Sequence, residues 1–146
     1  MVFLLVLALI AGAFLPLQAG INAHLRLYAG HPVIAAFISF AVGTLALLVA
    51  AFATRISWPV LSDFADAPWW VWTGGALGAI YVFLAVVLAN RLGASVLIAF
   101  IVAGQMIASI IVDHYGLVGF PRHPVNVWRI AGAILLLSGV VLIRYE

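Results

Sequence analysis

Polar side chains recur at intervals of four residues within otherwise apolar runs of the sequence. Gln105, Ser109 and Asp113 follow one another at this spacing, and so do Gln18 and Asn22. Residues four apart lie on the same face of a helix, so each set would form a polar stripe. These stripes carry amides, a hydroxyl and a carboxylate, which are groups that hydrogen-bond and orient a small polar solute.

Tyr81 would add a phenol near the middle of another helix. We therefore predict a solute-binding cavity, whose substrate-binding residues are Gln18, Asn22, Tyr81, Gln105 and Ser109. The alternative is that the amides and hydroxyls only bond one another across helices, which is worth about 0.6–2 kcal/mol each. For Ser109 a further alternative is a hydrogen bond back to its own helix.

Asp113, next to His114, is the only acidic residue outside the segment 54–68 and the C-terminus. At the mouth of a cavity its carboxylate would bind a proton or a cation. The structural alternative is that Asp113 caps loop amides near Gly116 or pairs with an interfacial arginine. This structural role, whether capping or pairing, is the more ordinary one for a carboxylate at a helix end.

Other kinds of chemistry find no support in the residues. The sequence has no Ser/His/Asp set at a plausible depth, no HExxH motif and no glycine-rich phosphate loop. The four histidines have no metal-ligand spacing, and the absence of cysteine excludes thiolate metal sites. There is no basic cluster for nucleic acid. We therefore predict no enzyme, no catalytic or metal-binding residues, no cofactor and no nucleic-acid partner.

The elements that position these side chains follow from composition. Of the 146 residues, 68% are hydrophobic and only 7% are charged, and the mean hydropathy is +1.33. That leaves too few polar residues to cover a soluble domain. Backbone groups in lipid must be satisfied within each span, and the continuous apolar runs favour helices over barrel strands. The sequence predicts an all-α, polytopic membrane protein whose partner is the lipid bilayer.

Five segments are long enough to cross the bilayer. They form one predicted domain over residues 1–146, with approximate spans at 2–25, 32–53, 69–89, 94–115 and 127–143. Pro16 interrupts the first span, and Pro32 suits the first turn of the second. The first run has no basic region ahead of it, so a cleaved signal peptide is not expected. Residues 90–93 are predicted to form a tight turn.

Small residues indicate where helices would approach closely. Gly74 and Gly78 form a GxxxG pair, and Ser39 and Gly43 have the same spacing in the preceding span. Such spacing lets helix backbones touch in a medium where apolar burial gives no drive to associate. We expect these four residues to pack helices, within one chain or between chains.

The arginines are balanced across the membrane. With five alternating spans, one side carries Arg55, Arg122 and Arg129, and the opposite side carries Arg26, Arg91 and Arg144; there is no lysine. Orientation is normally set by an excess of Lys and Arg in cytoplasmic loops. The level count predicts dual topology, in which chains insert both ways. The alternative is that one local charge near the first span still decides the orientation.

The same residues resemble a known family. The segments 16–25, 74–82, 104–109 and 113–117 look like the YdcZ-like proteins, a five-helix branch of the drug/metabolite transporter superfamily in bacteria. The resemblance implies a small inner-membrane transporter and half of an inverted-repeat fold, so that a single chain would work as an antiparallel homodimer. The small multidrug exporters of this superfamily carry an acidic residue in their first helix. The first span here has none, so their cation/proton exchange is not expected.

These observations converge on one functional hypothesis. We expect a dual-topology, antiparallel homodimer that transports a small polar solute by alternating access across the bacterial inner membrane. The alternatives are a non-transporting scaffold or accessory subunit, and a lipid-interacting protein. A scaffold has no need for amides on an interior wall, which separates it from a transporter.

Overall fold

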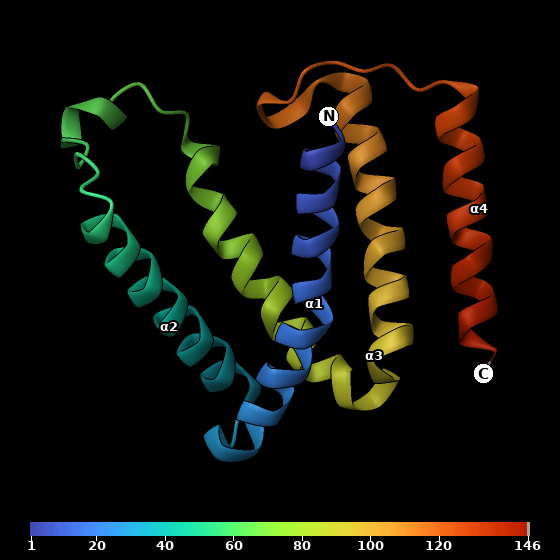
Figure 1. The fold of residues 1–146 in the computed structure, drawn as a ribbon, viewed down its shortest axis with the longest axis horizontal. Coiled ribbons are helices and arrows are strands. Elements are labelled where there is room, and N and C mark those ends of the chain that lie inside the picture. Colours follow the sequence, from blue (N-terminus) through green and yellow to red (C-terminus); the bar gives the residue numbers. More distant parts are fainter. Residues whose placement is uncertain (146) are drawn as a thin grey trace. The chain divides into compact units, whose positions relative to one another are not determined.

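The computed structural model describes residues 1–145, apart from the side chain of Leu61, and shows four long helices among them (Figure 1). The helices are α1 (Val2–Ala29), α2 (Pro32–Ala53), α3 (Thr73–Tyr115) and α4 (Val127–Arg144), with short 3₁₀ turns at Leu61–Phe64, Trp69–Trp72 and Leu117–Gly119. All four helices are long and apolar enough to cross a membrane. The prediction of an all-α, polytopic membrane protein is confirmed. Glu146, the last residue of the predicted domain, lies outside the described residues.

Helix α1 is longer and more regular than the sequence predicts. It continues through Pro16, where an interruption is expected, and it runs four residues past the predicted end. It ends because Gly30 adopts a left-handed conformation with φ 72°, and the Gly30 N–H bonds the Arg26 carbonyl at 2.9 Å. Glycine has no Cβ to oppose this conformation, which makes it the usual residue after a helix.

Helix α2 begins at the residue that the sequence indicates. Pro32 occupies its first turn, and the Nδ1 atom of His31 accepts a hydrogen bond from the Val33 N–H at 3.2 Å. At the other end, the Arg55 and Ile56 N–H groups donate to the Phe52 and Ala51 carbonyls, each at 3.2 Å. Both ends therefore satisfy backbone groups that a helix leaves free.

Helix α3 differs most from expectation. Trp69, Trp70 and Trp72 lie in a 3₁₀ turn before it, and its helical backbone then continues past Asn90. The only non-helical residue inside α3 is Gly93, with φ 73° and ψ 167°. The turn predicted over four residues is thus confined to one glycine, because this region of backbone space is accessible to essentially no other residue.

We expect Gly93→Ala to destabilise the protein, because an alanine at these angles is strained by about 1–3 kcal/mol. The matched control is Gly104→Ala, since Gly104 is also in α3 and a Cβ there meets nothing within 4 Å. Alanine favours a regular helix, so the control should be as stable as the wild type or more stable. Thermal unfolding of the purified variants measures both effects. A wild-type melting temperature for Gly93→Ala would contradict the assignment.

The chain forms two compact units, Met1–Arg91 and the residues from Leu92 onward. In the first unit, α2 and the first part of α3 converge beside the end of α1 and separate toward the 54–68 connection (Figure 1). Its core comprises Ala35, Ala36, Val82 and Val86, with Leu25, Ala29, Tyr81 and Phe83 packed around them. In the second unit, Ala99 and Ala103 of α3 pack against Val140 and Leu136 of α4. The single domain expected over residues 1–146 stays a prediction.

Most of the helical surface faces outward. In the most apolar window of each candidate span, at most 11% of the residues are buried. Apolar side chains exposed along a span face a medium that is as apolar as they are. One chain therefore offers nearly all of its helical surface to lipid or to another copy.

Of the four small residues predicted to pack helices, Gly78 has a contact within the chain. A Cβ at Gly78 would lie 3.4 Å from Cζ of Phe40, so the ring packs directly on the α3 backbone. A Cβ at Gly74 or Gly43 would meet nothing within 4 Å, and Ser39 is half-buried. Packing at these three residues stays a prediction.

Candidate functional site

The predicted site residues divide between the two units, which are described separately. Gln18, Asn22 and Tyr81 belong to the first unit, whereas Gln105 and Ser109 belong to the second. A groove lies in each unit, and the predicted site residues are distributed unevenly around these two grooves.

Asn22 is the one buried polar residue of the described chain, with 4% of its surface exposed. It lies on α1 among the buried Ala19 and Ala23. Within residues 1–145 the Asn22 side chain makes no hydrogen bond. In the same residues, every side-chain nitrogen or oxygen that is fully buried has a hydrogen-bond partner. The unpaired amide must therefore touch accessible space. A buried residue with an accessible, unpaired amide is suited to hydrogen-bond a solute.

Gln18, one turn earlier on α1, is exposed. The packed face of the helix is centred on Ala19, Asn22 and Ala23, which are neighbours at spacings of three and four. Gln18 therefore lies at the edge of this face, although its spacing from Asn22 predicts that both share one stripe. Tyr81 is half-buried on α3 and packs beside the core of the first unit.

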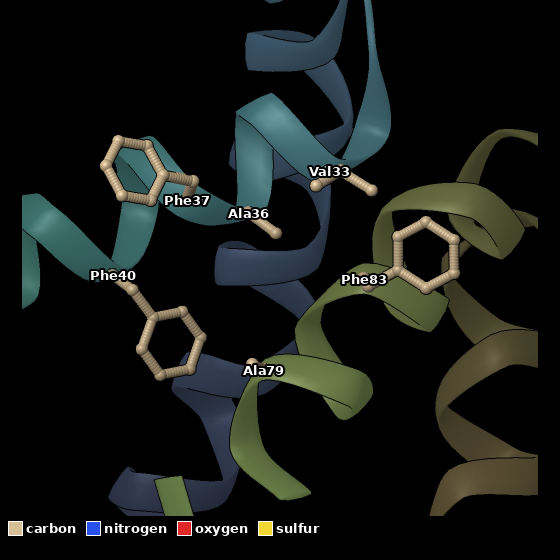
Figure 2. A pocket seen from close by; sticks show the side chains of 6 residues that line it. All are labelled: Val33, Ala36, Phe37, Phe40, Ala79 and Phe83. Carbon is tan, nitrogen blue, oxygen red and sulfur yellow. The ribbon is translucent and has the colours of Figure 1, made fainter. Parts of the chain in front are cut away.

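The groove of the first unit, here called the phenylalanine groove, has a volume of about 310 Å³ and lies between α2 and α3 (Figure 2). It is lined by Val33, Ala36, Phe37, Phe40, Ala79 and Phe83. None of the predicted site residues is among them, and no lining side chain can donate or accept a hydrogen bond. This groove is not the amide-lined cavity that the sequence predicts, because nothing in it would orient a polar solute.

The groove of the second unit, here called the ion-pair groove, has a volume of about 440 Å³ and lies between α3 and α4. It is lined by Met106, Ser109, Ile110, Asp113, Arg129, Gly132 and Ala133. Two members of the predicted stripe thus share this groove, while the Gln105 side chain is exposed and does not line it. The Ser109 hydroxyl donates to the Gln105 carbonyl, the bond back to its own helix that the sequence left open.

Asp113 forms an ion pair with Arg129, in which Oδ2 of Asp113 lies 3.1 Å from Nη1 of Arg129. The Asp113 side chain is 28% exposed and the Arg129 side chain is 33% exposed. This is the pairing with an interfacial arginine that the sequence offered as one alternative. Arg129 is absent from the predicted site, although the arginine count already placed it on the membrane side where the helix of Asp113 ends. Because Arg129 and Asp113 were predicted on the same membrane side, the sequence could have indicated Arg129 as a partner of Asp113.

The loop between α3 and α4 is tied to the end of α3. The His123 N–H donates a hydrogen bond to the Asp113 carbonyl at 2.7 Å. The His123 carbonyl in turn accepts a hydrogen bond from Nη1 of Arg129 at 3.0 Å. Nδ1 of His114 accepts a hydrogen bond from the Val125 N–H at 3.1 Å. The His114 carbonyl accepts one from Nε of Arg122, also at 3.1 Å. These bonds fix the two helix ends that carry the ion pair.

Apolar helices of membrane length, with polar residues placed within them, define a multi-pass α-helical membrane protein. The family model described as "Putative inner membrane exporter, YdcZ" matches residues 3–142, and the chain belongs to this family. The predicted membership of the YdcZ family is thereby confirmed, and the family's description supports a transporter. No curated protein and no solved structure matches the chain.

Proposed function

We propose that the protein transports a small metabolite across the inner membrane by alternating access, as an antiparallel homodimer. The observation that carries the proposal is the buried Asn22, whose accessible amide has no partner in the described chain. A buried polar group on a lipid-spanning helix is costly unless a ligand or another polar group binds it. Substrate contacts are proposed for Asn22 and, with it, for Gln18, Tyr81, Gln105 and Ser109.

The proposal includes five membrane crossings. Helix α3 has 43 residues, and a straight helix of that length would measure about 65 Å, twice the roughly 30 Å of a hydrocarbon core. Gly93 breaks the helix into two segments of roughly 20 residues, each enough for one crossing. We infer that the chain reverses at Gly93, so that α3 crosses twice and the other three helices cross once each.

Five crossings and a level arginine count support the antiparallel dimer. An odd number of crossings places the two ends of a chain on opposite sides, and three arginines on each side give no preferred orientation. Two inverted copies would reproduce the inverted repeat that transporters of this kind use. Inward- and outward-facing states then have equal energy by symmetry when no gradient is present, which alternating access can use.

A metabolite screen tests the proposal. Purified protein should be stabilised against heat by at least one small polar metabolite, because a ligand at 100 times its Kd adds about 2.7 kcal/mol to the folded state. The same compound should enter or leave proteoliposomes that contain the protein, and not empty liposomes. A scaffold or accessory subunit would show neither stabilisation nor flux. Stabilisation by phospholipid alone would favour a lipid-interacting protein, for which the phenylalanine groove offers an apolar surface.

A further inference from the structure

The ion-pair groove combines charged, polar and apolar walls. Asp113 and Arg129 carry the charges, Ser109 adds a hydroxyl, and Met106 and Ile110 belong to the apolar wall. The α3 residues that line it span two helical turns, or about 10 Å. Its volume of about 440 Å³ falls in the range of small-molecule sites.

The two charges neutralise each other but keep hydrogen-bonding capacity. A guanidinium has five N–H donors, and within residues 1–145 only Nη1 of Arg129 has partners, namely Asp113 and His123. In the same residues, Oδ2 of Asp113 takes part in the ion pair and Oδ1 has no partner. Both groups can therefore bind a further molecule without giving up their own contact.

We propose that the ion-pair groove binds a small zwitterion that carries an apolar group, such as an aliphatic amino acid. Its carboxylate would bind the guanidinium of Arg129, its ammonium the carboxylate of Asp113, and its apolar group the wall at Met106 and Ile110. A ligand with net charge would leave one uncompensated charge in a site that is two-thirds buried, whereas a zwitterion adds none. The inference rests on the transporter proposed above, and it names the class of substrate that would contact Ser109 in that transporter.

The dimensions favour a free solute over a lipid. One leaflet of the hydrocarbon core is about 15 Å thick, half of the roughly 30 Å of the whole. A lipid chain would therefore extend well beyond a groove of about 10 Å. An amino acid with an aliphatic side chain would be accommodated within it.

Three related probes test the charge requirement on the purified full-length protein. L-Leucine carries both charges, N-acetyl-L-leucine lacks the ammonium, and L-leucine methyl ester lacks the carboxylate. Calorimetry and thermal stabilisation should show that leucine binds, and that each analogue binds at least about tenfold more weakly, because one charged partner is left unpaired. No binding of leucine, or equal binding of either analogue, would overturn the proposal.

A matched pair of variants tests the location. Asp113→Asn/Arg129→Gln replaces the ion pair by two uncharged amides, and leucine affinity should fall by at least about tenfold. Arg144→Gln is the control, since Arg144 is exposed in the last turn of α4 and does not line the groove. If the double variant fails to fold, Arg129→Lys keeps the charge but loses the planar fork, and should also bind leucine more weakly. Wild-type affinity in the folded variant would refute the site.

Flux measurements separate the failure of this inference from that of the transporter. Leucine binding without flux of any solute would leave the groove assignment standing and reject transport. Flux of another metabolite with no leucine binding would support transport and reject the groove assignment. Native mass spectrometry gives the lipid outcome: phosphatidylethanolamine that co-purifies with the wild type but not with Asp113→Asn/Arg129→Gln, without leucine binding, would overturn the zwitterion proposal.

Discussion

Replacing Asn22 by alanine should abolish ligand-dependent stabilisation and reduce flux by about 10- to 100-fold, because one or two hydrogen bonds to the solute are lost. Protein yield and oligomer size should not change, since the Asn22 side chain makes no hydrogen bond within the described residues. Thermal stabilisation by the solute found in the metabolite screen and its flux in proteoliposomes measure the effect. We expect Gln105→Ala to act in the same direction.

Asn90→Ala is the matched control for Asn22→Ala. Asn90 is also an asparagine on a long helix, but it is exposed, so its removal should leave both binding and flux unchanged. If Asn22→Ala and Gln105→Ala instead unfold or aggregate, these amides join helices rather than bind solute. If both variants remain fully active, the substrate binds elsewhere.

The sequence predicts helix positions well where local chemistry decides them. Pro32 and the preceding His31 define the start of α2 through groups adjacent in the chain. The sequence predicts helix boundaries less well where a single residue departs from the average conformational preference of its type. Pro16 is accommodated inside α1, because in membrane helices neighbouring groups can satisfy the carbonyl that a proline leaves free. Gly93 needs no flanking loop, because a single glycine can adopt a backbone conformation that otherwise takes several residues.

Spacing along one helix is visible in a sequence, whereas packing between helices is not. The spacing of four predicts that Ser109 and Asp113 share a helix face, and both residues line the ion-pair groove. It does not show that Gln18 lies at the edge of the packed face, since that depends on which neighbours cover α1. The Asp113–Arg129 pair joins two helices across a loop, so its geometry depends on how that loop folds back. The sequences of α2 and α3 do not reveal the phenylalanine groove, because apolar residues occur throughout this chain.

Cysteines introduced at opposite ends of two chains should crosslink if the dimer is antiparallel. The protein has no native cysteine, so a single introduced thiol is reported without background. Val2 and Tyr145 are suitable positions, because they are 73% and 86% exposed. When Val2→Cys and Tyr145→Cys chains with different tags are expressed together, a short thiol crosslinker should join the two tags. Each variant expressed alone should give almost no crosslinked dimer.

The bilayer should make the difference in crosslinking between co-expressed and singly expressed variants close to all or none. In an antiparallel pair with five crossings per chain, the N-terminus of one copy shares a membrane side with the C-terminus of the other. The two N-termini are then separated by about 30 Å of hydrocarbon, which a short linker cannot span. Adding two lysines to one loop should force a single orientation and suppress the mixed crosslink, since the positive-inside rule would then apply. Crosslinking only between identical ends would show a parallel dimer, in which inward- and outward-facing states are not related by symmetry, and alternating access by two inverted copies would be excluded.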